Sequence, residues 1–481
     1  MPGSSRSFDA HPADKDGTDN PFEGGLAGRR RKAAITLAVV WLGTITLHLV
    51  PGGFWVIVGL SLLVGIHLFR AMFTRPRPPV APLEGDSADY PFISLLVAAK
   101  NEEAVISGLV KNLCALDYPQ ARYDVWIIDD ASTDNTPAIL DRMGQAYANL
   151  HVVHRPAGAG GGKSGALNDV WPRTSADIMA VFDADAQVPQ NLLRRVVPLF
   201  RQADVGAVQV RKAIANAPTN FWTRAQAGEM LLDSYVQEQR IASGGMGELR
   251  GNGQFVRRRA IEDCHGWNEE TITDDLDLTL RLHLNRWSIS HLFAPAVQEE
   301  GVTGAVSLWH QRSRWAEGGY QRYLDYWRLI AQNRLGTRKT IDMVMFLIIQ
   351  YLVPTAAIPD LMMALARGRF PILSVMTTLT TGFSLVGATM GQRRLRRAAA
   401  ADPAETALLA IAPASTPWQK LLTAGRILLR SLRTTVYMLH WMLVIGSTSI
   451  RIAIRPKRLK WVKTVHRGSS EADDGGLLID I

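Results

Sequence analysis

Cysteine is almost absent from this chain of 481 residues. Cys114 and Cys264 are its only cysteines, and they lie far apart in the sequence. Two isolated thiols exclude a framework of several disulfides and a cysteine-rich metal cluster. This sparse use of cysteine is typical of a protein that folds in a reducing compartment.

A basic surface of the kind that binds nucleic acid is also missing. The formal net charge is +9, but the basic residues gather beside apolar segments, at 29–32 before the first and at Arg70, Arg75 and Arg77 after the second. A nucleic-acid site needs basic residues on the polar part of the chain, interleaved with stacking aromatic residues. The charge therefore indicates attraction to the anionic headgroups of membrane lipids, and we expect no nucleic-acid partner.

A complete phosphate-binding P-loop is lacking too. The glycine-rich run 158–165 contains Lys163 and Ser164, but Ala157 stands where the motif needs a glycine. An ATPase is therefore excluded. Two interpretations of the run stay open, namely a flexible linker and a loop that brings Lys163 to a diphosphate.

Long apolar runs, by contrast, are present near both ends of the chain. They predict membrane-spanning helices over 33–50, 54–69, 341–366 and 370–390, since a span needs roughly 17–25 residues. A signal peptide is the alternative for the first run, but a polar leader precedes it and a second apolar run follows at once. Whether 434–450 is a further span stays open, because the basic tail after it favours the cytoplasmic side.

The order of polar and apolar segments predicts the domain layout. In chain order we expect a disordered polar tail (1–28), two transmembrane helices (29–75), a polar cytoplasmic domain (90–335), C-terminal transmembrane and interfacial helices (336–455) and a basic cytoplasmic tail (456–481). Leucines at helical spacing over 418–433, with basic residues on other faces, predict the helix that lies in the membrane surface. The sequence thus predicts a multi-pass integral membrane protein with its polar domain in the cytoplasm.

Within the polar domain, short apolar runs alternate with helical patterns. A buried strand is expected at 93–98, further strands at 125–128, 151–154, 178–182 and 205–210, and helices at 102–116 and 135–148. Such alternation predicts an α/β fold with a mostly parallel sheet and helices on both faces. Ligands of such sheets bind at the carboxyl ends of the strands.

Polar residues follow two of these predicted strands. Asp129 and Asp130 end one, and Ala98 leads to Glu102 at the end of the other. Taken alone, Asp129-Asp130 is equally typical of a helix N-cap. Two adjacent strand ends with polar groups instead favour a pocket for a nucleoside.

Asp183-Ala184-Asp185 closes a third apolar run. A turn after the strand lets both carboxylates approach one cation, and their hard oxygens suit Mg²⁺ or Mn²⁺. An isolated Asp-x-Asp is common by chance. The second acidic pair, Asp274-Asp275, favours the metal interpretation.

Thr273-Asp274-Asp275 has two compatible interpretations. One is a helix start, with Thr273 as N-cap and acids where the helix dipole favours them. The other is a general base, because a carboxylate at a helix N-terminus is well placed to accept a proton.

Gln311-Arg312-Ser313-Arg314-Trp315 precedes an amphipathic aromatic stretch at 320–328. Arg314 supplies a fixed cation for a diphosphate leaving group, and Trp315 a flat apolar face for a sugar or acceptor. A membrane-interface belt is the alternative, since Trp and Arg are also enriched there. Both roles are compatible at this position.

In this order, the acidic pairs and the Gln-x-x-Arg-Trp motif resemble the membrane-bound family 2 glycosyltransferases, which include cellulose, chitin and hyaluronan synthases. The resemblance covers 90–335 and implies a GT-A nucleotide-sugar domain. It implies these roles: Ala98, Glu102 and Asp130 at the uracil, Asp183 and Asp185 at the diphosphate and its Mg²⁺ (or Mn²⁺), Asp275 as general base, and Gln311, Arg314 and Trp315 near the diphosphate and acceptor.

Longer strings are similar to a cyanobacterial branch of this family that makes glucolipids. They lie at 95–104, 247–255, 309–320 and 455–466. This similarity implies UDP-glucose as donor, diacylglycerol in the bilayer as acceptor, and a bacterial inner or thylakoid membrane as location.

The motifs alone leave other functions open. A processive polysaccharide synthase shares all of them, although few and short spans argue against a polymer channel. A transferase acting on polyprenyl phosphate or ceramide differs only in its acceptor. A catalytically silent nucleotide-binding module is the third alternative, but it has no use for a base at Asp275.

Overall fold

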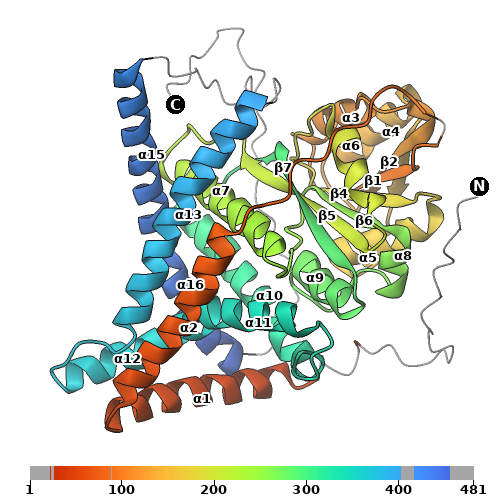
Figure 1. Cartoon of the computed structure of the whole chain (residues 1–481). Coiled ribbons are helices and arrows are strands. Elements are labelled where there is room, and N and C mark those ends of the chain that lie inside the picture. The colour runs from red at the N-terminus through yellow and green to blue at the C-terminus, as the bar shows by residue number, and fades with distance from the viewer. Residues whose placement is uncertain (1–21, 23–26, 88, 402–415, 456–481) are drawn as a thin grey trace, which may run out of the picture.

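The structure is a computed structural model that describes residues 22, 27–87, 89–401 and 416–455. The tail predicted at 456–481 and most of the tail predicted at 1–28 lie outside the described residues. An α/β part and a group of long helices lie side by side (Figure 1).

A seven-stranded sheet forms the centre of the α/β part. The strands are β1 (Ile93–Ala99), β2 (Tyr123–Asp129), β3 (Leu150–His154), β4 (Ile178–Phe182), β5 (Val205–Ile214), β6 (Gln254–Arg257) and β7 (Ser288–Glu299). Their order is β3-β2-β1-β4-β6-β5-β7, and only β6 runs antiparallel to its neighbours. The predicted α/β class with a mostly parallel sheet is therefore confirmed.

Helices cover both faces of this sheet. One face packs against α3 (Ile106–Cys114), α4 (Thr136–Ala146) and α6 (Leu192–Val196), and the other against α5 (Gly162–Val170), α8 (Arg258–Asp263) and α9 (Asp274–Leu284). Leu95 faces the first layer and Leu96 the second, and both are fully buried. Burial on both faces explains why β1 is an unbroken apolar run rather than an alternating one.

The remaining long helices gather beside the sheet, with α2, α13 and α15 on the left of Figure 1. They are α1 (Arg29–Leu49), α2 (Gly53–Phe73), α7 (Phe221–Ala242), α10 (Ala305–Ala331), α11 (Thr337–Leu347), α12 (Val353–Ala366), α13 (Ser374–Ala401), α15 (Pro417–Met438) and α16 (His440–Ile454). Helix α13 packs against α2, α7 and α15, whereas α16 packs against α1, α10 and α12. Because α7 also packs on β5, this group is joined directly to the sheet.

Among the described residues, four helical segments are long and apolar enough to cross a membrane. They are Arg29–Leu49, Gly53–Phe73, Thr337–Ala366 and Pro417–Ile454. The span predicted over 370–390 overlaps α13 but is not among them, because α13 begins only at Ser374 and leaves the apolar residues Phe370, Ile372 and Leu373 outside the helix. The last segment contains both 434–450, which the sequence left open, and the predicted interfacial helix over 418–433.

Candidate active site

All of the site residues predicted from the sequence line one cavity of ≈ 1420 Å³. These residues are Ala98, Glu102, Asp130, Lys163, Asp183, Asp185, Asp275, Gln311, Arg314 and Trp315. The cavity begins at the carboxyl ends of β1, β2 and β4 and continues between α2, α7, α13 and α15. Groups that are far apart in sequence therefore share one space with residues of the long helices.

Side chains join the loops that follow β1 and β2. The backbone N–H of Asn101 donates to Ser132 Oγ at 2.8 Å, and that of Thr133 donates to Asn101 Oδ1 at 2.7 Å. The N–H of Glu102 donates to Thr136 Oγ1 at 2.8 Å. These bonds fix the two strand ends relative to each other, which gives the predicted nucleoside pocket a rigid wall.

Asp130 is held by Arg155, a residue that the sequence pattern did not single out. Arg155 Nη1 donates to Asp130 Oδ1 at 2.5 Å, Nε to Asp169 Oδ2 at 2.8 Å and Nη2 to the Gly160 carbonyl at 3.0 Å. Lys100 Nζ lies 3.5 Å from the other Asp130 oxygen. Arg155 directly follows β3, so the shared carboxyl edge of parallel strands was the signal that could have found it.

The glycine-rich run forms a structured turn in the cavity wall. Its glycines at 158 and 160–162 have positive φ angles, which glycine adopts without steric cost. Helix α5 begins there, and Lys163 Nζ donates to Asp183 Oδ1 at 2.6 Å. Burial alone would lower the pKa of Lys163, but Asp183, Asp274 and Asp275 outweigh burial and raise it.

The two carboxylates after β4 differ in their partners. Asp183 accepts from Lys163, while Asp185 Oδ2 accepts from the backbone N–H of Glu300 at 2.9 Å. No group of three or more His, Cys, Asp or Glu side chains is arranged to hold a metal among the described residues. Two carboxylates nevertheless fit Mg²⁺ or Mn²⁺ when diphosphate oxygens complete the coordination. This donor set suits a cation that arrives with a nucleotide sugar.

Asp275 lies in the first turn of α9, beside Gly251. Its Oδ1 accepts from the backbone N–H of Leu276 at 2.8 Å, and a Cβ added at Gly251 would lie 3.4 Å from Oδ2. Burial, together with the neighbouring carboxylate of Asp274, raises the pKa of Asp275 from 3.8 to about 6. Thr273 occupies the N-cap position as predicted, but its hydroxyl makes no capping bond. A carboxylate with this pKa can accept a proton near neutral pH.

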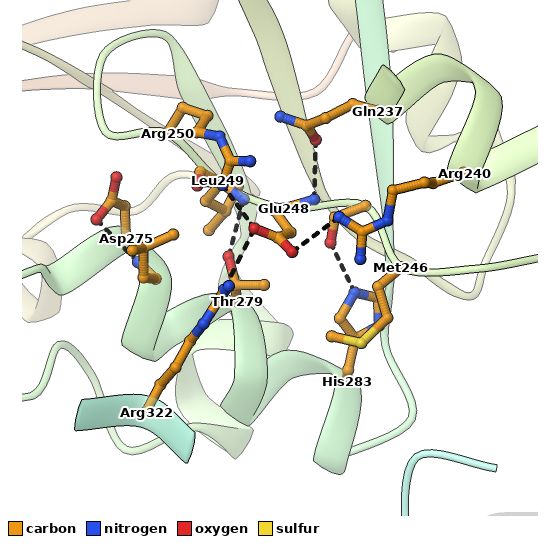
Figure 2. Close-up of polar contacts among 12 residues, drawn as sticks. Gln237, Arg240, Met246, Glu248, Leu249, Arg250, Asp275, Thr279, His283 and Arg322 are labelled. Atoms are coloured by element: carbon orange, nitrogen blue, oxygen red, sulfur yellow. Dashed lines mark hydrogen bonds and ion pairs between the residues drawn. The ribbon is translucent and has the colours of Figure 1, made fainter. Parts of the chain in front are cut away.

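The irregular segment Met246–Arg250, which we call the strap, contributes Glu248 and Arg250 to the cavity lining (Figure 2). Four of its N–H groups donate to side chains from other elements instead of a neighbouring strand. The bonds run from Met246 to Asp342 Oδ2 (2.9 Å), from Glu248 to Gln237 Oε1 (3.0 Å), from Leu249 to Thr279 Oγ1 (2.8 Å) and from Arg250 to Gln209 Oε1 (2.6 Å). The strap is therefore positioned by helices α7, α9 and α11 and by β5.

The Glu248 carboxylate anchors the strap in a buried cluster of arginines (Figure 2). It lies 2.6 Å from Arg250, 2.9 Å from Arg240 and 3.3 Å from Arg322. Burial alone would raise the pKa of Glu248, but the three arginines outweigh burial and hold it well below its usual range. Because Arg240 belongs to α7 and Arg322 to α10, the ion pairs of this cluster connect the strap to both helices.

Helix α10 carries the Gln-x-x-Arg-Trp motif, and its two arginines have different surroundings. Arg312 is fully buried, pairs with Glu229 at 2.5 Å and lies 4.0 Å from the centre of the Trp315 ring. Arg314 forms no ion pair with any described residue. Burial lowers the pKa of Arg314, while Asp183 and the pair Asp274-Asp275 oppose that effect. The motif thus contains a buried structural arginine, Arg312, and a second arginine, Arg314, that lines the cavity and forms no ion pair with any described residue.

Comparison with known proteins places this arrangement in a family. Residues 91–318 match the description "Glycosyltransferase like family 2". A β-monoglucosyldiacylglycerol synthase from a Nostoc species is 58% identical over 444 residues, which cover 92% of this chain and 90% of the relative. The chain belongs to the family 2 glycosyltransferases. The β-monoglucosyldiacylglycerol synthase from a Synechocystis species is 52% identical to this chain over 466 residues, which cover 96% of this chain and 94% of the relative.

Other known proteins are less similar to this chain in sequence. A probable glycosyltransferase of Bacillus subtilis, YdaM, is 29% identical over 239 residues, covering 48% of this chain and 56% of the relative. A mannosyltransferase from Pyrobaculum calidifontis, solved with GDP-Man and Mn²⁺, is 19% identical with a TM-score of 0.46, covering 88% of this chain and 99% of its own. A fragment of S. aureus TarS with UDP-GlcNAc is 15% identical with a TM-score of 0.37, covering 58% and 92%.

Proposed function

We propose that this glycosyltransferase moves glucose from UDP-glucose to the 3-hydroxyl of 1,2-diacylglycerol with inversion, forming β-monoglucosyldiacylglycerol. The high identity to synthases of this name, over nearly the full length of both chains, supports the reaction. The observation that carries the proposal is the single cavity, because the same space reaches the acids at the sheet edge and the long apolar helices. A nucleotide sugar and a lipid can meet there.

In this reaction the acceptor oxygen attacks the anomeric carbon of glucose. Asp275 takes the proton of the attacking hydroxyl while the bond between that carbon and the diphosphate breaks. UDP leaves with the bonding electrons, and the α-linked sugar becomes a β-glycoside. The pKa of about 6 supports Asp275 as the base, because most of its carboxyl groups are ionised at pH 7.

Positive charge on the leaving group's side stabilises the departing diphosphate. We assign this stabilisation to Lys163 and Arg314, since both residues line the cavity. The carboxylates of Asp183, Asp274 and Asp275 affect the pKa of both residues. Asp183 and Asp185 would hold Mg²⁺ or Mn²⁺ with the diphosphate. The bound cation would neutralise the charge that develops there.

The uracil end of the donor is assigned to the wall between β1 and β2. Ala98 and Glu102 lie on one strand end and Asp130 on the other, with Arg155 fixing Asp130. Gln311 and Trp315 are assigned to the acceptor side of the sugar. Residues 90–335 would then be a cytoplasmic catalytic domain, and the apolar segments would make the chain a multi-pass protein of a bacterial inner or thylakoid membrane.

The direct test uses purified full-length protein with Mg²⁺ and diacylglycerol micelles. Radiolabelled UDP-glucose and UDP-galactose are supplied in separate reactions, and the lipid extract is analysed. We expect label only from UDP-glucose, in a monohexosyl lipid that β-glucosidase cleaves. The Asp275→Asn variant is the matched control and should make no lipid product.

Other products would assign a different acceptor or donor. Label in a water-insoluble or high-mass polymer would identify a polysaccharide synthase and overturn the lipid assignment. Lipid labelled from UDP-galactose alone would overturn the choice of sugar while keeping the acceptor.

A further inference from the structure

Glu229 is a buried acid on helix α7 that no sequence motif singled out. It lines the cavity, yet the residue is only 5% exposed. A buried charge without partners costs several kcal/mol, so the partners of Glu229 decide what its carboxylate can do. Its hydrogen-bond partners among the described residues come from three other long helices.

These partners occupy both oxygens of the Glu229 carboxylate. Oε2 accepts from Arg312 Nη2 at 2.5 Å and from the Tyr437 hydroxyl at 3.3 Å, and Oε1 accepts from Trp441 Nε1 at 2.8 Å. Arg312 belongs to α10, Tyr437 to α15 and Trp441 to α16. Trp441 lines the cavity, as does its neighbour Met442. The carboxylate therefore joins the helix of the Gln-x-x-Arg-Trp motif to helices that supply apolar residues to the cavity wall.

Arg312 extends this anchoring to the motif itself. Its Nη1 donates to Gln311 Oε1 at 3.0 Å, and its guanidinium carbon lies 4.0 Å from the centre of the Trp315 ring. Arg312 is fully buried and is not part of the cavity lining, whereas Gln311 and Trp315 both are. A charge-assisted hydrogen bond and a cation held against an aromatic ring are both attractive contacts. The guanidinium therefore fixes the orientation of two side chains that line the cavity.

A purely structural ion pair is the alternative interpretation of Glu229 and Arg312. Buried ion pairs contribute little net stability, because desolvation of both charges offsets their attraction. Another ion pair of α7, between Glu238 and Arg394 at 2.9 Å, lies outside the cavity lining. The Glu229 pair differs from it because its arginine contacts two residues of the cavity wall. This difference favours a role in the site.

We propose that Glu229 is a positioning residue for the lipid acceptor. Through Arg312 it orients Gln311 and Trp315, and through Trp441 it holds them in place relative to the apolar helices. The inference rests on the proposed function, which assigns Gln311 and Trp315 to the acceptor side of the sugar. Glu229 is not a catalytic residue, since both of its carboxylate oxygens bond protein groups and it acts through Arg312.

The test compares Glu229→Gln, which removes the charge at nearly constant size, with the wild-type full-length protein. Its kcat/KM for diacylglycerol should fall about 10- to 100-fold, because a misplacement of about 1 Å in a site can cost about 10²-fold. The Kd for UDP should stay unchanged, because the uracil is assigned to the ends of β1 and β2. Glu229→Asp keeps the charge and should lose less activity. A wild-type kcat/KM in Glu229→Gln would overturn the proposal.

A double variant separates positioning from stability. Glu229→Gln and Arg312→Met each leave one charge buried without its partner and should lower the Tm. The double variant leaves neither charge unpaired, so its Tm should exceed that of both single variants. Its kcat/KM for diacylglycerol should nevertheless stay low, because no guanidinium orients Gln311 and Trp315. A double variant that regains both Tm and kcat/KM would show that the pair only stabilises the fold, and the proposal would fall.

Glu238→Gln is the matched control. It breaks the ion pair with Arg394 on the same helix, and the side chain of Glu238 is 13% exposed, close to the 7% of Glu229. Because Glu238 does not line the cavity, this variant should keep the wild-type kcat/KM. An equal loss in Glu238→Gln would attribute the effect to α7 as a whole and contradict the positioning role.

Binding of radiolabelled diacylglycerol to the solubilised protein, measured without UDP-glucose, distinguishes this inference from the proposed function. If the wild type forms no glucolipid, the proposed reaction fails and lipid binding decides the role of Glu229. Weaker binding of diacylglycerol by Glu229→Gln than by the wild type, with UDP binding unchanged, then supports the positioning role. Equal binding by the two proteins overturns it.

Discussion

The pH dependence of the reaction tests one electrostatic feature of the site, the raised pKa of Asp275. The rise from 3.8 to about 6 corresponds to about 3 kcal/mol at 1.36 kcal/mol per pKa unit. This free energy disfavours the charged carboxylate, first because the group is buried and second because Asp274 repels it. A base must be deprotonated to act, so kcat/KM should fall about tenfold per pH unit below the pKa.

Asp274→Asn removes one of these causes and keeps the other. Without the neighbouring charge the pKa of Asp275 should fall, while burial keeps it above 3.8. The acid limb of the pH profile should therefore move from near pH 6 to lower pH. The variant would then retain a larger fraction of its maximal activity at pH 5 than the wild type does.

The assay is kcat/KM for glucolipid formation between pH 4.5 and 8 at constant ionic strength. Glu262→Gln is the control. Glu262 is exposed, and among the described residues its one ion pair is with Arg258 at 3.9 Å, so this substitution should leave the limb in place. An acid limb that stays put or moves to higher pH in Asp274→Asn would refute the assignment of the limb to Asp275.

Four further predictions concern other parts of the site. Asp275→Asn should lower kcat by about 10²–10⁴-fold, the contribution typical of a general base, while UDP binding measured by calorimetry persists. The folded-state pKa of Asp275 lies above its unfolded value, so the charged carboxylate destabilises the fold above pH 6. The variant should therefore have a higher Tm than the wild type at pH 7.5 but not at pH 4. Arg155→Met should raise the Kd for UDP about 10- to 150-fold, since a hydrogen bond to a charged group contributes about 1.5–3 kcal/mol. Arg155→Lys should not restore UDP binding, because a lysine cannot bond Asp130, Asp169 and the Gly160 carbonyl at the same time. Gly319→Ala should lower both Tm and activity because the added methyl group overlaps the Tyr351 hydroxyl, and Tyr351→Phe in the same chain should restore part of both. EDTA should abolish transfer, and Mg²⁺ or Mn²⁺ should restore it, if Asp183 and Asp185 hold a cation with the diphosphate; full activity in EDTA would contradict that role.

Local patterns predicted much of the α/β part. The apolar runs that became β1, β2, β4 and β5 were recognisable because strands buried on both faces need continuous apolar sequence, whereas β3 is short and partly exposed. Strand β6 was missed because it has only four residues, and β7 because polar residues interrupt its apolar ones. The span predicted over 370–390 was a harder case, since the sequence alone did not show that the helix begins only at Ser374, after the first apolar residues of the run.

The residues of the candidate site likewise include some that local sequence predicted and some that it did not. Asp130, Asp183 and Asp275 could be singled out because each lies beside a strand end or a helix start that the chain itself encodes. Arg155 and the arginines around Glu248 could not, because their importance depends on partners from other elements. The sequence also could not separate Arg312, which pairs with Glu229, from Arg314, which lines the cavity and forms no ion pair with any described residue.

By itself, the sequence determined the order of the acids, the alternation of strands and helices and the apolar segments beside them, because each depends on neighbouring residues. Only the tertiary structure decided which of these groups share one cavity, how far burial and Asp274 raise the pKa of Asp275, and that the partners of Glu229 come from three other helices. Burial and the distance between charges are set by the packing of segments that lie far apart in the chain, and no local pattern records them.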